Sequence, residues 1–147
     1  MKKFVFTLEK VLNYKRQVLE EEKNEMAGLQ SKLRALEGEI FALESRSGEL
    51  DRELALRLRG GVATREASSC KDYQDELIRK IRMLLREKGL LLESIAQKRR
   101  EIVRMNGDIS GLERLRDRQW SDYRKLCGKE QERAVEEFVG RARCSAG

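Results

Sequence analysis

Apolar residues recur along this chain at alternating steps of four and three, which is the spacing of a heptad repeat. A stripe of this kind marks one face of an amphipathic helix. Two such series are present, and eleven of the fifteen positions in each are apolar. The first is Leu8, Leu12, Lys15, Leu19, Glu22, Met26, Leu29, Leu33, Leu36, Ile40, Leu43, Ser47, Leu50, Leu54 and Arg57. The second is Leu77, Ile81, Leu84, Lys88, Leu91, Ile95, Lys98, Ile102, Met105, Ile109, Leu112, Arg116, Gln119, Tyr123 and Leu126. The chain is therefore predicted to form two long helices, each with one apolar seam.

A glycine pair, Gly60 and Gly61, separates the two series, and small polar residues follow it. We expect one helix over about 7–58, a turn over about 59–68, a second helix over about 69–140 and a short tail over 141–147. Two seams joined by a short turn bury each other when the helices run antiparallel. The predicted fold class is all-α, a single antiparallel coiled-coil hairpin.

Pairing across this turn predicts that Leu8 lies opposite the region of Leu112 to Leu115 and that helix two overhangs by about twenty-five residues. Several large side chains would then lack a helix-one partner. They are Trp120, Tyr123, Leu126, Val135 and Phe138. Aromatic residues are common binding anchors, so the overhang is either a partner-binding surface or a frayed tail.

Composition fits a thin helical body better than a globule. Charged residues make up 39% of the chain, aromatic residues 5%, and proline is absent. So few large apolar side chains cannot fill a thick core. The net charge of +6, with clusters at 79–82 and 98–100, permits attraction to an acidic protein, acidic lipid or nucleic acid. A solvated basic helix face explains the same charge, and interspersed acids make the overhang a poor nucleic-acid binder.

The sequence contains no arrangement of residues that catalysis or metal binding requires. It has no histidine, and Cys70, Cys127 and Cys144 are too widely spaced for a zinc site. Glycine-rich phosphate loops are missing, and carboxylates on a solvated helix face have no pocket to shift their pKa. No apolar run approaches the roughly twenty residues that span a bilayer. We expect a non-enzymatic cytosolic protein without cofactor or metal, which meets a membrane only peripherally through partners.

A third apolar column accompanies each seam. Phe4, Val11 and Val18 recur every seven residues beside the first seam, and Ile78, Leu85 and Leu92 do so beside the second. Two-stranded coiled coils usually carry charges at these positions. The columns either widen the hairpin interface or form a docking stripe for a partner helix.

Both ends of the chain resemble the flagellar export protein FliJ family. The opening motif is FVFTLEKVLNYKR at 4–16, in which two aromatic residues and a leucine precede a leucine-valine run and basic residues. The closing motif is Glu130-Gln131 followed by Ala134, Glu136, Glu137, Phe138 and Arg141. Glu132 and Val135 stand where that family usually has lysine and aspartate.

The resemblance implies a cytoplasmic component of the bacterial flagellar type III export apparatus, at the inner face of the inner membrane. Members look like the central stalk (gamma) subunit of rotary ATP synthases, stimulate a hexameric export ATPase, contact the membrane export gate and escort export chaperones. The isolated protein is expected to be a monomer. The residues implied at the ATPase end are Phe4, Phe6, Leu8, Leu12, Trp120, Tyr123, Glu130, Gln131 and Phe138. Those expected to contact the export gate are Tyr73, Leu77, Ile78 and Leu85. Two alternatives are the equivalent stalk of a virulence-type secretion system and a general coiled-coil scaffold that dimerises end to end.

Overall fold

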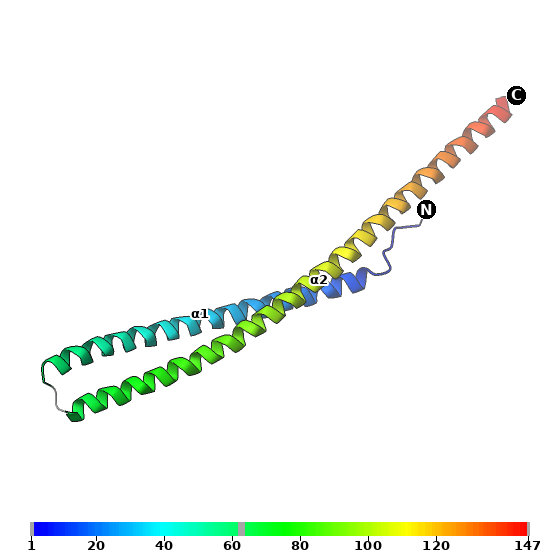
Figure 1. The fold of residues 1–147 in the computed structure, drawn as a ribbon. Helices are drawn as coiled ribbons and strands as arrows, with labels where there is room; N and C mark the ends of the chain where they lie inside the picture. The colour runs from blue at the N-terminus through cyan, green and yellow to red at the C-terminus, as the bar shows by residue number, and fades with distance from the viewer. Residues whose placement is uncertain (1, 62–63, 147) are drawn as a thin grey trace. The chain divides into compact units, whose positions relative to one another are not determined.

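The computed structural model describes residues 2–61 and 64–146. These residues form two helices, α1 (Glu9–Arg59) and α2 (Thr64–Ala146), and no strand occurs within the described ranges. In Figure 1 α1 runs from blue to green and α2 from green to red. The predicted all-helical fold, with two helices that pack against each other, is confirmed.

The helix bounds differ from the predicted ones mainly around the turn and at the tail. α1 begins at Glu9 instead of about residue 7, α2 begins at Thr64 instead of about residue 69, and α2 continues to Ala146 through most of the predicted tail. The alanine, serine, threonine and glutamate residues from Thr64 onward cost a helix little, and no proline stops it later. Residues 62 and 63 of the predicted turn lie outside the described residues.

The end of α1 is fixed by the glycine pair. The Gly60 amide donates hydrogen bonds to the carbonyl oxygens of Leu56 and Arg57, both at 3.1 Å. Gly61 has a φ of 78°, in the left-handed region that side chains with a Cβ rarely adopt. The predicted break between the two seams is therefore a glycine-terminated helix end.

Packing divides the chain into two units. The terminal unit comprises the described parts of Met1–Glu20 and Val103–Gly147, and the turn unit comprises the described parts of Glu21–Ile102. Each unit pairs a segment of α1 with a segment of α2.

Ion pairs show that the helices run antiparallel within each unit. In the terminal unit Glu9 pairs with Arg116 at 3.9 Å, and further along α1 Lys15 pairs with Asp108 at 3.6 Å. In the turn unit Glu22 pairs with Lys98 at 2.7 Å. Further along α1 in the same unit, Glu37 pairs with Lys88 at 3.7 Å. Because the partner number falls as the α1 number rises, both segment pairs are antiparallel.

The two predicted seams form the core. Nine of the ten buried apolar residues are seam positions, and the tenth is Phe6. The buried seam residues are Leu12, Leu19, Met26, Ile40, Leu50, Leu77, Leu84, Ile95 and Ile109. Among all thirty seam positions only Arg57 and Leu126 are exposed. The heptad assignment is therefore correct along nearly the whole of both series.

Five of the six charged residues in the two seam series form ion pairs across the two helices, and Arg57 is the exception among the described residues. Lys98 is the strongest case, because its Nζ lies 2.7 Å from a Glu22 carboxylate oxygen and 2.6 Å from one of Glu25. The hydrogen bonds from Glu22 and then Glu25 raise the pKa of Lys98 above its ordinary value. A raised pKa in the folded state means that this stabilisation is complete at neutral pH and is lost as the pH rises through that pKa. Such pairs favour one antiparallel register, because a shifted register would leave a seam charge unpaired.

Candidate partner-binding surfaces

An aromatic cluster joins the two ends of the chain in the terminal unit. The Phe4 ring centroid lies 5.0 Å from that of Trp120 in an edge-to-face arrangement and 5.4 Å from that of Tyr123. Trp120 and Tyr123 stack at 5.7 Å on α2. The Tyr123 hydroxyl donates a 2.7 Å hydrogen bond to the Lys2 carbonyl oxygen. The non-helical segment before α1 therefore lies along α2 (Figure 1).

Trp120 and Tyr123 were predicted to lack a helix-one partner, and the residue that contacts both is Phe4, which precedes α1. The contact with Phe4 is partial, since Trp120 remains 45% exposed, and the fully exposed stretch of α2 begins about ten residues later than predicted, over residues 129–145. An extended chain rises about 3.3 Å per residue and a helix about 1.5 Å, so a short non-helical segment covers a long stretch of α2. Leu126 remains exposed, as do Val135 and Phe138.

The Tyr123 hydroxyl is held as a hydrogen-bond donor. A hydrogen bond with the Cys127 thiol and, secondarily, burial raise the pKa of Tyr123. The phenol therefore stays protonated over a wider pH range than an isolated tyrosine and continues to donate to the Lys2 carbonyl.

The aromatic cluster supports a direct spectroscopic prediction. Trp120 is the single tryptophan of the chain, so tryptophan fluorescence reports on the surroundings of this one side chain. In the variant Phe4→Ala we expect a red-shifted emission and increased quenching by acrylamide, because the indole loses a neighbouring ring and gains contact with water. The matched control is Val5→Ala, which changes an exposed neighbour in the same segment. Equal spectra for the two variants would show that Phe4 does not cover Trp120.

The C-terminal part of α2 forms an exposed extension, defined here as residues 129–145. It carries the predicted residues Glu130, Gln131 and Phe138, and the Phe138 side chain is 74% exposed. Val135, Phe138 and Val139 follow each other at steps of three and one, which places them on one helix face. The extension therefore offers a narrow apolar strip between charged residues.

All nine residues predicted at the ATPase end belong to the terminal unit, and they differ in exposure. Phe6 is 5% exposed, Leu12 is fully buried, and Leu8 is partly buried. Their side chains hold the α1 segment against α2 and position the residues around them. Phe4 and Tyr123 are partly buried as well, and the exposed members of the predicted set are Trp120, Glu130, Gln131 and Phe138. Partner binding by this set stays a prediction.

The residues predicted to contact an export gate lie in the turn unit and do not share one surface. Leu77 is buried in the seam, while Tyr73, Ile78 and Leu85 are exposed. Helical spacing places Ile78 and Leu85 on one side of the seam, in line with Leu92, and Tyr73 on the other side. About two fifths of each of these three aliphatic side chains remains accessible. Ile78, Leu85 and Leu92 are therefore partly covered within the turn unit, and their accessible parts form an aliphatic line at the surface.

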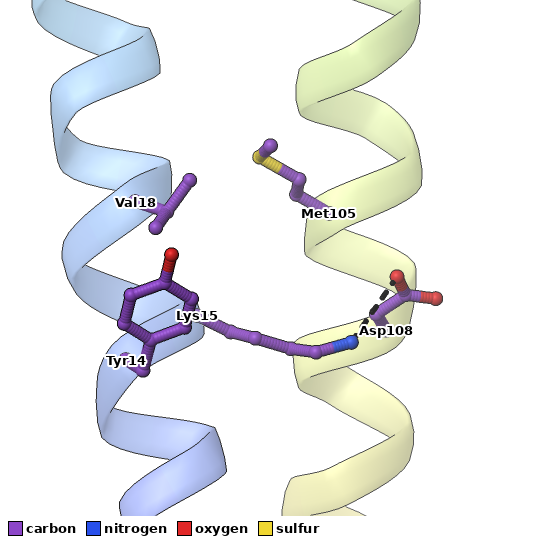
Figure 2. Close-up of a pocket in the computed structure, with 5 residues that line it drawn as sticks. All are labelled: Tyr14, Lys15, Val18, Met105 and Asp108. Carbon is purple, nitrogen blue, oxygen red and sulfur yellow. Dashed lines mark ion pairs between the residues drawn. The ribbon is translucent and has the colours of Figure 1, made fainter.

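A small surface pocket of about 190 Å³ lies between α1 and α2 in the terminal unit. Figure 2 shows its lining, with Tyr14, Lys15 and Val18 from α1 facing Met105 and Asp108 from α2. The ion pair between Lys15 and Asp108 closes one end. Pockets for small molecules usually measure 300–1,000 Å³, so this one has room for a single apolar side chain of a partner. Sequence reasoning missed it, although Val18 in the third apolar column was a partial signal.

The described residues were also compared with the requirements of metal sites, membrane spans and known protein families. Cys70, Cys127 and Cys144 are free thiols, and no group of three or more potential ligands in the described ranges is placed to hold a metal ion. Neither helix, over its described length, combines the apolar character and length needed to cross a bilayer. No protein-family model matches this chain, and no curated protein or solved structure is significantly similar to it.

Proposed function

We propose that this chain is a non-enzymatic, FliJ-like stalk and escort component of the bacterial flagellar type III export apparatus. The observation that carries the proposal is the contact between the opening motif and the part of α2 that directly precedes the closing motif. The opening motif at 4–16 and the residues just before the closing motif are far apart in sequence, yet both belong to the terminal unit. The contact of Phe4 with Trp120 and Tyr123 ties them together.

The proposed role needs binding and stiffness but no chemistry. The exposed extension would enter the ring of the hexameric export ATPase, with Phe138 as an apolar anchor and Gln131 and Glu130 as polar contacts. A helix that contacts ring subunits unequally can favour one subunit conformation over another and so speed hydrolysis. In this respect the chain would act like the central stalk of a rotary ATP synthase. Contacts with the export gate and with export chaperones would place it at the cytoplasmic face of the inner membrane.

The test is ATP hydrolysis by the cognate export ATPase with and without this protein. We expect the wild-type chain to stimulate hydrolysis, and the variants Phe138→Ala and Gln131→Ala to need about tenfold more protein for the same effect. Phe41→Ala is the matched control, because Phe41 is 71% exposed and belongs to the turn unit. Absence of stimulation, or an equal loss in the Phe41 variant, would contradict the proposal.

The exposed extension also favours a second function, a general helical scaffold that dimerises end to end. Sedimentation separates the two functions, since the stalk is expected to be a monomer at micromolar concentration. A dimer that leaves the export ATPase unaffected would support the scaffold. Stimulation of an injectisome ATPase, but not of the flagellar one, would assign the chain to a virulence-type system.

A further inference from the structure

The positive charge of the chain is concentrated in one part of α2. Residues 78–100 contain eight basic and two acidic residues, a net charge of +6. This equals the net charge of the entire chain, so the remaining residues together are neutral. The whole segment belongs to the turn unit and is helical throughout. At about 1.5 Å per residue it extends the positive charge over about 33 Å.

Most of these cations are free to meet an external anion. Lys88 and Lys98 are engaged with carboxylates of α1. Five exposed arginines have no carboxylate within ion-pair distance in the part of the chain that the structure describes. They are Arg79, Arg82, Arg86, Arg99 and Arg100. An unpaired row of guanidinium groups is an electrostatic footprint for an anionic partner.

The same side of the helix carries the aliphatic line. Ile78, Arg82 and Leu85 follow each other at steps of four and three, so they are neighbours on the surface. Arg99 continues the seven-residue series of Ile78, Leu85 and Leu92. Arg79, Arg86 and Arg100 lie one helix position outside it, in a column whose remaining member is Glu93. The face, which we name the arginine-leucine face, thus combines the five arginines with Ile78, Leu85 and Leu92.

We propose that the arginine-leucine face binds directly to an anionic phospholipid surface. Guanidinium groups would contact lipid phosphates, while the partly exposed aliphatic side chains enter the boundary between headgroups and acyl chains. A basic helix with a line of aliphatic side chains is typical of peripheral membrane contact. The face has no aromatic side chain on which a base could stack, which argues against single-stranded nucleic acid. The even, partial exposure of its three aliphatic residues suits shallow insertion better than a deep anchor in an acidic protein.

The test is co-sedimentation of the full chain with phosphatidylcholine vesicles that contain or lack phosphatidylglycerol. We expect binding only to the anionic vesicles, and its loss at high salt. The triple variant R79Q/R82Q/R86Q should bind about a hundredfold more weakly. Its matched control, R133Q/R141Q/R143Q, removes the same charge from the exposed extension and should bind like the wild type. Millimolar inorganic phosphate should not compete, because it offers no acyl boundary.

A second variant, L85Q/L92Q, separates lipid insertion from simple charge attraction. Both side chains are partly exposed, so circular dichroism should show an unchanged helix content. We expect this variant to bind the anionic vesicles at least tenfold more weakly. The proposal is overturned if the wild type does not bind anionic vesicles, if the extension control loses as much affinity as the triple variant, or if L85Q/L92Q binds normally. Binding to an acidic peptide or an oligonucleotide without vesicle binding also overturns it.

Discussion

Replacing Leu12 by alanine is expected to lower the free energy of unfolding by about 3 kcal/mol. Leu12 is the one described side chain of the core with no exposed surface. Its truncation removes apolar contacts and leaves a cavity that a two-helix body can only partly close. Because domains are stable by only about 5–15 kcal/mol, such a loss is a large share of the total. Guanidinium unfolding followed by circular dichroism measures it.

Leu126→Ala is the matched control for this prediction. Leu126 belongs to the same terminal unit and to a predicted seam, but its side chain is 58% exposed. Its truncation should change the free energy of unfolding by less than about 0.5 kcal/mol. Similar losses in the two variants would mean that burial at Leu12 does not stabilise the terminal unit.

Reversing the charge at Lys98 is expected to lower the midpoint of thermal unfolding by about 5 °C or more. Lys98→Glu would place a carboxylate beside those of Glu22, Glu25 and Glu101, which all lie within 4.0 Å of the Lys98 ammonium group. The Lys98 side chain is only 18% exposed, so water cannot fully screen the repulsion. Lys80→Glu, the same change at an exposed site of α2, should have a much smaller effect.

The double variant Lys98→Glu with Glu22→Lys should regain part of the lost stability. It restores opposite charges at the contact between α1 and α2, although Glu25 still repels the new carboxylate. Recovery in this variant, but not in Glu22→Lys alone, would locate the effect at this pair. If both single variants and the double variant unfold at the wild-type temperature, the pairing of Lys98 with Glu22 is wrong.

The core of the fold was predictable because one physical pattern determines it. The steps of four and three leave two stripes that only an antiparallel partner within the chain can cover. The predicted alignment was also close, since Glu9, next to Leu8, pairs with Arg116 rather than with residues 112–115. Gly60 and Gly61 end α1 where the sequence predicted a break.

The errors arose where the chain leaves the heptad pattern. Periodicity describes helices, so it gave no position for the non-helical segment that brings Phe4 to Trp120. The starting residue of α2 was also missed, because residues such as Thr64 and Ser68 suit both a turn and a first helical turn.

The partner-binding residues were harder to predict than the fold, because the two end motifs contain both core residues and exposed residues. Phe6 and Leu12 serve packing within the terminal unit, whereas Gln131 and Phe138 are free to meet a partner. Sequence alone cannot separate the roles of Phe6 and Phe138, because core positions and binding anchors both favour large aromatic side chains.

Zero-length carbodiimide cross-linking of the wild-type protein tests the antiparallel pairing within one chain most directly. The Lys98 ammonium group lies 2.7 Å from a Glu22 carboxylate and 2.6 Å from one of Glu25, so an amide bond should form without a spacer. Mass spectrometry of an equal mixture of ¹⁴N- and ¹⁵N-labelled protein should show Lys98 joined to Glu22 or Glu25 in peptides of one isotope only. Mixed-isotope peptides, or links between positions that a parallel dimer would bring together, would contradict the account.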